Sequence, residues 1–310
     1  MRVFVTGATG YIGGSVADLL LRSGHRVEGL VRTEDKAREL KRRGITPVLG
    51  TLDDGALLTA RAREADAVVN AASGDHRGAV EALVEGLAGT GRALVHTSGS
   101  SIVSTDSRGA AADEVFTEEI VAPGSSWRPV EEKADRVALD RFVLDAAGSG
   151  VRSVVLCNSL VYGHGRGMAH DSVQIPALAR QARAGGVVRY VEAGRNIWST
   201  VHIDDMADLY LRALTDASAG SFYFVENGEA SFADISASLA SALGLGPAES
   251  WDTDTAVAYW GHELALYVLA SNSRVRSRGA RLGWRPAHPS VLDWIERDCL
   301  CQSHRTAEII

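Results

Sequence analysis

Short runs of apolar, often β-branched residues alternate with amphipathic stretches along the first half of the chain. The amphipathic stretches repeat their apolar positions at helical spacing, whereas the short runs are mostly apolar, as expected for strands buried on both faces of a sheet. This alternation predicts an α/β fold with a doubly wound parallel sheet and helices on both faces. The expected strands are Arg2–Thr6, Arg26–Val31, Thr46–Leu49, Ala67–Ala71, Leu94–Ser98 and Val151–Leu156.

The regular alternation ends after Leu156, where the pattern predicts a smaller C-terminal lobe. Insertions after the carboxyl ends of parallel strands are where such sheets bind ligands, so we expect this lobe to bind the substrate. Residues 1–160, together with 197–225, are assigned to the sheet domain, and residues 161–196 and 226–310 to the substrate-binding lobe. The helices expected here lie near Val173–Ala184, Asp204–Leu214, Phe232–Leu243 and Ser290–Cys299.

A glycine-rich loop, Thr6–Gly14, follows the first strand directly and leads into a helix. Gly7 suits a tight turn, Gly10 lets the backbone approach a pyrophosphate, and Gly13 allows close packing of helix on strand. The free N–H groups of the helix N-terminus favour an anion. A glycine-rich turn without a ligand is the alternative, which the combination of strand, spacing and helix disfavours. The segment predicts a Rossmann dinucleotide site whose loop residues include Thr9, Tyr11 and Ile12.

The end of the second strand indicates which dinucleotide binds. NAD-binding chains carry a carboxylate there for the adenine ribose, but this chain has Val31 followed by Arg32. A guanidinium can bind a 2′-phosphate with two hydrogen bonds, so the sequence favours NADP, with Lys36 or Arg38 as helpers. The alternative is that Arg32 is a solvated cation at a strand end. Further cofactor contacts are expected after the later strands, at Thr51, Leu52, Ala71, Ala72 and Asn158.

Composition narrows the possible partners and the cellular location. A net charge of −7 without a basic run argues against nucleic acid and anionic membranes, since both require clustered Lys and Arg. Cys157, Cys299 and Cys301 show no metal-ligand spacing and are an odd number for a disulfide framework. No signal peptide or membrane-spanning run is recognised, so we expect a cytoplasmic protein that uses no metal. The sequence does not indicate the oligomeric state.

Three segments resemble the extended short-chain dehydrogenases, the NAD-dependent epimerase/dehydratase group. They are the loop TGATGYIGG, the later Val161-Tyr162-Gly163, and Val201–Ala207, and the resemblance covers nearly the whole chain. It implies a catalytic Ser or Thr after the fifth strand and a Tyr-x-x-x-Lys pair on the next helix. In that family the Tyr exchanges a proton with the substrate oxygen and the Lys lowers the pKa of the Tyr.

The residues that the resemblance implies for catalysis are absent. Gly99 occupies the Ser/Thr position, and with Asp140 aligned to the acidic residue that often follows the Lys, Arg136 takes the Lys position and Glu132 the Tyr position. None of the seven tyrosines is followed by a lysine four residues later. The chain is therefore similar to atypical members of the superfamily, such as the ketoreductases of actinomycete aromatic polyketide (angucyclinone) pathways.

Two residues are candidates for contact with the reacting group. Ser98, at the end of the fifth strand, could polarise a carbonyl, or it could bond only to backbone. His202 titrates in a useful range, or it could be a structural histidine tied to Asp204 or Asp205. The favoured interpretation is an NADPH-dependent reductase of an aromatic ketone in antibiotic biosynthesis. The alternatives are an NADP-binding sensor or scaffold without turnover, and a sugar-nucleotide epimerase or dehydratase.

Overall fold

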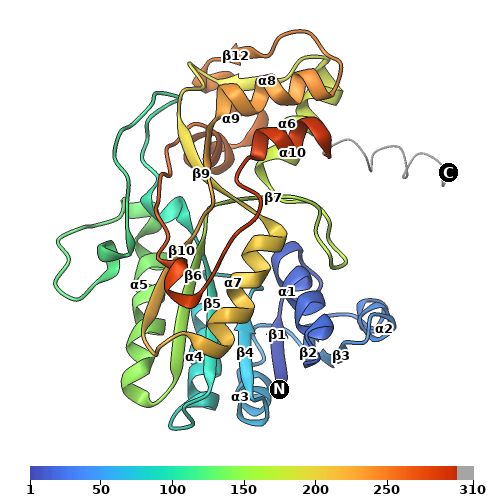
Figure 1. Cartoon of the computed structure of the whole chain (residues 1–310), viewed down its shortest axis with the longest axis vertical. Helices are drawn as coiled ribbons and strands as arrows, with labels where there is room; N and C mark the ends of the chain where they lie inside the picture. The colour runs from blue at the N-terminus through green and yellow to red at the C-terminus, as the bar shows by residue number, and fades with distance from the viewer. Residues whose placement is uncertain (299–310) are drawn as a thin grey trace.

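The structure is a computed structural model that describes residues 1–298. A seven-stranded sheet lies at its centre, with every strand parallel to its neighbours and the order β10-β6-β5-β4-β1-β2-β3 (Figure 1). This architecture confirms the doubly wound parallel sheet expected from the sequence. Its strands are β1 (Arg2–Thr6), β2 (Arg26–Val31), β3 (Thr46–Leu49), β4 (Ala67–Asn70), β5 (Ala93–Gly99), β6 (Arg152–Asn158) and β10 (Ser221–Val225).

Helices cover both faces of this sheet. Alternate residues of each strand enter different cores: Val3 and Val5 belong to one cluster and Phe4 to the other, and all three are fully buried. This burial on both faces explains why the strands are almost entirely apolar. The first face is packed by α1 (Tyr11–Arg22), α2 (Glu34–Arg42) and α7 (Ile203–Asp216), and the second by α3 (Gly55–Glu64), α4 (Arg77–Leu87) and α5 (Ala134–Asp145).

A smaller lobe with its own hydrophobic core lies above the carboxyl ends of the strands (Figure 1). One of its sheets contains β7 (Leu160–Tyr162), β9 (Ile197–His202) and β11 (Glu229–Ser231), and the other β8 (Arg189–Val191) and β12 (Glu249–Trp251). Its helices are α6 (Gln174–Gly185), α8 (Phe232–Ala242), α9 (Thr253–Trp260), the π-helix η5 (Glu263–Leu269) and α10 (Val291–Arg297). Short 3₁₀ turns in residues 1–298 are η1 (Ser100–Val103), η2 (Glu118–Val121), η3 (Glu131–Lys133), η4 (Ala146–Ser149) and η6 (Gly279–Leu282).

Some segments differ in extent or place from the sequence-based expectation. β9 pairs with β7 and β11 in the lobe, whereas α7 and β10, from the same 197–225 segment, pack on or join the central sheet. β6 runs two residues further than expected and so includes Asn158. The last helix ends at Arg297. Cys299, Cys301 and the end of the 226–310 segment lie outside the described residues.

Candidate functional site

The loop between β1 and α1 folds as a close turn that only glycine fits. Gly7 has φ +75°, and a Cβ on it would lie 2.5 Å from the carbonyl oxygen of Ala71. A Cβ on Gly13 would lie 2.4 Å from the carbonyl oxygen of Gly7. Both contacts are with backbone, which cannot move away as a flexible side chain could. The turn therefore presents bare backbone next to the N-terminus of α1.

The N-terminus of α1 is open to an anion. Its N-cap is Gly10, which has no side chain to bond the first turn, and the first turn holds no acidic residue. The N–H groups of Tyr11 and Ile12 lie in that first turn, where a helix supplies no partner. By contrast, α2 is capped by the side chain of Thr33. A pyrophosphate at the α1 N-terminus would be favoured both by these free donors and by the helix dipole.

A cavity of about 490 Å³ lies over this loop and the carboxyl ends of β1 to β4. Eight of the residues expected to bind the cofactor line it. They are Gly7, Thr9, Gly10, Arg32, Thr51, Leu52, Ala71 and Ala72. Lys36, one of the two expected helpers, lines it too, and the remaining lining residues are Leu30, Val31, Asp53 and His76. Residues that lie far apart in the sequence therefore form one pocket at the edge of the sheet where Rossmann domains bind dinucleotides.

The charge of this pocket is positive where the adenine ribose would lie. Val31, at the end of β2, is buried and apolar, and Arg32 and Lys36 line the cavity beside it. Neither cation is paired with a carboxylate of residues 1–298. Arg38 instead forms an ion pair with Asp35 and is not among the lining residues. Arg32 and Lys36 are thus available to a phosphate group.

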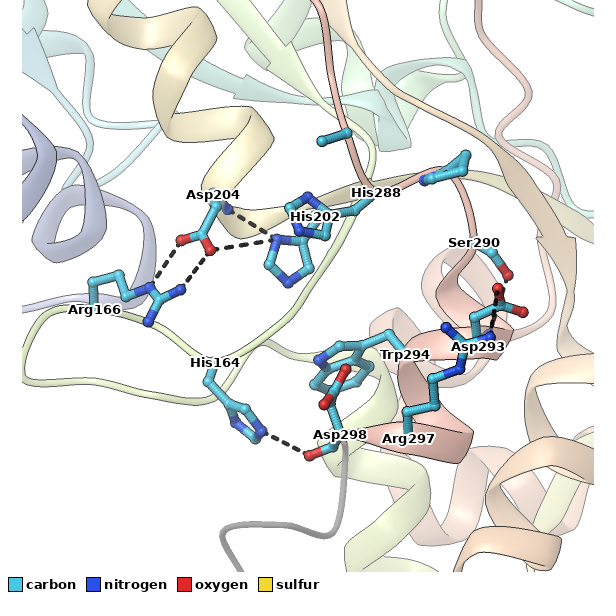
Figure 2. Close-up of a pocket in the computed structure, with 12 residues that line it drawn as sticks. His164, Arg166, His202, Asp204, His288, Ser290, Asp293, Trp294, Arg297 and Asp298 are labelled. Atoms are coloured by element: carbon cyan, nitrogen blue, oxygen red, sulfur yellow. Dashed lines mark hydrogen bonds and ion pairs between the residues drawn. The ribbon is translucent and has the colours of Figure 1, made fainter.

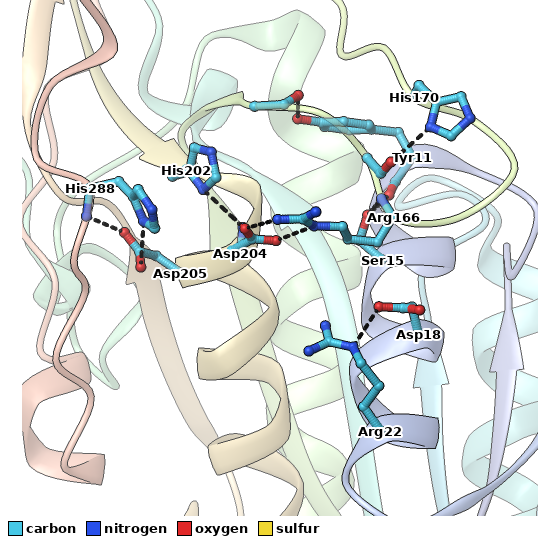
Figure 3. A network of polar contacts seen from close by, with 12 residues as sticks. Tyr11, Ser15, Asp18, Arg22, Arg166, His170, His202, Asp204, Asp205 and His288 are labelled. Atoms are coloured by element: carbon cyan, nitrogen blue, oxygen red, sulfur yellow. Dashed lines mark hydrogen bonds and ion pairs between the residues drawn. The ribbon is translucent and has the colours of Figure 1, made fainter. Parts of the chain in front are cut away.

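Three expected cofactor contacts do not line the cavity. The Tyr11 hydroxyl donates to the carbonyl oxygen of Gly163 at 2.8 Å, which ties α1 to the lobe (Figure 3), and Ile12 leaves only its backbone N–H for a ligand. Asn158 donates to the Tyr210 hydroxyl at 2.8 Å, while its own Oδ1 is buried without a partner in the described part of the chain. This unpartnered acceptor at the end of β6, together with the glycine turn, fits the nicotinamide and pyrophosphate parts of a dinucleotide.

Ser98 is oriented toward the interior of the sheet domain. It is 5% exposed, and its hydroxyl donates to Asp140 Oδ2 of α5 at 2.7 Å. Burial raises the pKa of Asp140 to about 7, although the Ser98 hydrogen bond and the Arg136 charge act in the opposite direction. Ser98 therefore has a carboxylic acid partner that the sequence did not indicate.

His202 lies in the lobe rather than near Ser98. Its Nδ1 accepts from the backbone N–H of Asp204 and so caps α7, and its ring stacks on His288 with centroids 4.0 Å apart. Burial and the neighbouring His288 lower its pKa to about 4, so the ring is neutral at physiological pH. It lines a second cavity of about 490 Å³, together with Arg166 and Trp294 (Figure 2).

Arg136, which takes the Lys position of the family, lies next to Gly99. A Cβ on Gly99 would be 3.8 Å from Arg136 Nη1. The guanidinium bonds both oxygens of Asp75, from the loop after β4, and donates to Ser101 Oγ at 3.2 Å. This pairing raises the pKa of Arg136 further above its already high value. Arg136 can therefore supply a fixed positive charge and hydrogen bonds, but no proton.

A tyrosine and a lysine meet in space here, although no sequence spacing relates them. The Tyr267 hydroxyl, from η5 of the lobe, donates to Glu132 Oε1 at 2.7 Å, and Lys133 Nζ lies 5.1 Å from the centre of the Tyr267 ring. Lys133 is also paired with Glu263 at 2.5 Å. The Glu132 hydrogen bond raises the pKa of Tyr267 to about 12. These contacts join the start of α5 to the lobe.

Comparison with known proteins identifies the family. Residues 3–223 match the model of the NAD dependent epimerase/dehydratase family, and the chain belongs to that family. It is 32% identical to the protein named oxidase ucsJ from Acremonium sp, over 95% of each chain. It is 28% identical to the 4-hydroxy-2-methyl-3-oxo-4-farnesyl-3,4-dihydroquinoline-1-oxide ketoreductase of Stigmatella aurantiaca, over 74% of this chain and 69% of that one.

The fold is also that of solved structures. A dTDP-glucose 4,6-dehydratase of Streptomyces venezuelae, solved with NAD bound, superimposes with a TM-score of 0.73 at 20% identity and covers 99% of this chain and 98% of its own. Within residues 1–298, no helix has the length and apolar character needed to cross a membrane. The same residues contain no group of three His, Cys, Asp or Glu side chains placed to hold a metal ion.

Proposed function

We propose that this protein is an NADPH-dependent ketoreductase that reduces an aromatic polyketide ketone of the angucyclinone type in antibiotic biosynthesis. The cofactor assignment rests on two cations, Arg32 and Lys36, which line the cavity beside the apolar Val31 and have no carboxylate partner in the described residues. A ribose with two free hydroxyls finds no carboxylate in the Val31 position, whereas a 2′-phosphate finds two cationic donors. The ketoreductase and oxidase names of two relatives support redox chemistry.

Removal of the Arg32 guanidinium tests the cofactor assignment. Arg32→Ala should cost a charge-assisted interaction of about 1.5–3 kcal/mol, a roughly 10- to 150-fold loss of NADPH affinity, with little change for NADH. Arg38→Ala is the matched control, because Arg38 is exposed, paired with Asp35 and outside the cavity. Fluorescence titration of both cofactors measures these affinities. Equal affinity of the unaltered protein for NADPH and NADH would refute the assignment.

The proton needed after reduction is the harder part of the reaction. Bound NADPH would supply the hydride, and the protein must orient the ketone and stabilise the developing alkoxide. Arg136 is permanently charged and the Tyr267 hydroxyl is directed at Glu132, so neither is set to donate a proton to the substrate. A phenol beside the ketone can give its proton to the alkoxide that hydride transfer forms, and water later reprotonates the phenolate. The enzyme would then select peri-hydroxylated aromatic ketones.

A matched pair of ketones tests this proton route, one with the adjacent phenol free and one with it methylated. Methylation should abolish reduction, whereas Ser98→Ala or His202→Ala should each lower it only about 10- to 100-fold, as expected for lost orientation. Equal rates for the two ketones would show that the proton comes from the protein or from water.

A second candidate function is an NADP-binding sensor or scaffold. It is favoured by the absence of a Tyr-x-x-x-Lys pair and by the ion pair that ties Arg136 to Asp75. It predicts tight NADPH binding without oxidation of the cofactor by any aromatic ketone. A sugar-nucleotide epimerase or dehydratase is the weaker alternative, because those reactions depend on the tyrosine that this chain lacks.

A further inference from the structure

A row of buried polar side chains crosses one face of the central sheet at the carboxyl ends of its strands. Thr6, Asn70, His96 and Ser98 come from β1, β4 and β5, and each is at most 5% exposed. They follow apolar residues such as Phe4, Val68 and Leu94 on the same face, which is covered by α3, α4 and α5. Thr6 directly precedes the glycine turn, so the row lies next to the cofactor loop.

Hydrogen bonds along this row determine which ring nitrogen of His96 carries the proton. Thr6 Oγ1 accepts from the N–H groups of Ala71 and Ala72, so its own proton goes to Asn70 Oδ1 at 2.6 Å. The amide nitrogen of Asn70 therefore faces His96 Nδ1 at 3.0 Å and donates to it. A neutral His96 that accepts at Nδ1 carries its proton on Nε2. Burial lowers the pKa of His96 to about 4, so it stays neutral at physiological pH.

Two unpartnered polar atoms meet at the end of this row. His96 Nε2 and Asp140 Oδ1 lie 3.7 Å apart, and neither has a hydrogen bond within the described part of the chain. Both side chains are fully buried. The Asp140 carboxyl is thus bonded by one side chain, Ser98, through Oδ2. A buried carboxylate with a single donor is costly, and protonation relieves the cost.

We propose that Asp140 is a positioning residue that stores a proton and thereby sets the direction of the Ser98 hydroxyl. When Asp140 is ionised, Ser98 donates to it at the observed contact and has only lone pairs left for another group. When Asp140 is protonated, its O–H donates to Ser98 Oγ, and the Ser98 proton is released to point elsewhere. In the second state the Ser98 hydroxyl is free to donate to a different acceptor, and in the first state it is not.

The groups packed around Asp140 place this change near neutral pH. Burial raises the pKa of Asp140 to about 7, with Asp75 acting in the same direction and the Arg136 charge, one turn earlier on α5, opposing both. His96 of β5 is neutral, and Cys157 of β6, whose thiol pKa is also raised by burial, stays protonated. Arg136 stays charged at every relevant pH and is ion-paired with Asp75. Asp140 is therefore the group of this cluster that changes charge around neutral pH.

The proposal is tested first in the protein without cofactor or substrate, by ¹³C NMR of carboxyl-labelled aspartate. One resonance should titrate near neutral pH and disappear in Asp140→Asn, whereas Asp145→Asn, which removes an exposed carboxylate of the same helix, should leave it unchanged. Ser98→Ala should move this titration to higher pH, because the hydrogen bond that is removed favours the ionised form. The proposal is overturned if Asp140 has a pKa in the ordinary range for aspartate, or if its pKa does not change in Ser98→Ala.

The consequence for catalysis rests on the proposed ketone reduction and on the expectation from the sequence that Ser98 contacts the ketone. Turnover should fall above neutral pH in the unaltered protein. It should stay level in Asp140→Asn, since the side-chain amide introduced by this substitution would donate to Ser98 at every pH. Ser98→Ala should be slow throughout. If Asp140→Asn keeps the same decline, the catalytic role is refuted, even where NMR shows the coupled titration. If no ketone is reduced at all, the proposed function fails, while the NMR titration still decides the state of Asp140.

Discussion

The two edges of the central sheet are built in different ways. At the β1–β3 edge, the cofactor pocket is made from short segments that follow successive strands, such as Gly7, Arg32 and Thr51. Toward the opposite edge, where β10 is the outermost strand, side-chain contacts around β5 and α5 join distant residues: Ser98 with Asp140, Arg136 with Asp75, and Tyr267 with Glu132. The first site follows from local spacing, whereas the second depends on tertiary packing. Because the two edges can change independently, a chain can keep the cofactor pocket of its family while its residues around β5 and α5 differ from those of the family.

The largest effect should come from closing the glycine turn. Gly7→Ala adds a Cβ 2.5 Å from backbone at φ +75°, and strain and overpacking together cost about 2–6 kcal/mol. We expect NADPH binding to be lost in fluorescence titration. Gly24→Ala is the matched control, because Gly24 has φ +80° but nothing within 4 Å of the added Cβ. Similar losses in both variants would mean that backbone strain alone, and not the turn's close contact, is responsible.

The second effect is a pH dependence of stability that arises at the other edge. The pKa of Asp140 is about 7 in the folded chain and about 4 when unfolded, so between these values the folded state alone keeps the proton. Stability from this group is fully present below about pH 4 and is lost as the pH rises to about 7, by up to about 4 kcal/mol. Denaturant unfolding of the unaltered protein and Asp140→Asn at several pH values measures it. Parallel stability curves for the two proteins would contradict it.

The sequence predicted the first edge well because strands, turns and helix starts are encoded by neighbouring residues. The glycine spacing and the residues that follow β2, β3 and β4 identified eight residues of the pocket. The sequence could not show that Ser98 faces Asp140, that His202 caps α7, or that the Tyr267 hydroxyl bonds Glu132. These contacts depend on how α5 and the lobe pack against the rest of the chain, and the pattern of apolar and polar residues does not predict that packing. One feature of the sequence could have indicated Asp140: it is a carboxylate among the apolar residues of the buried face of α5.

The smallest effect should come from the contact between Tyr267 and Glu132. Tyr267→Phe removes the hydroxyl but keeps the ring over Lys133, so the lobe should stay docked and the melting temperature should fall only slightly. Reduction of a phenolic ketone should slow by less than about tenfold, because one orienting hydrogen bond is lost and no acid is removed. A variant that binds NADPH normally but has lost all turnover would instead make Tyr267 the proton donor.

We propose that NADPH bound at the β1–β3 edge reduces an aromatic ketone without a catalytic Tyr–Lys pair. The most direct measurement uses NADPH carrying deuterium at the transferred position, mixed with the protein and a phenolic aromatic ketone, followed by mass spectrometry of the product. We predict an alcohol that contains the deuterium at the former carbonyl carbon, formed with NADPH far faster than with NADH. Tight NADPH binding with no deuterium in any product across a panel of such ketones would contradict the account and favour a sensor or scaffold.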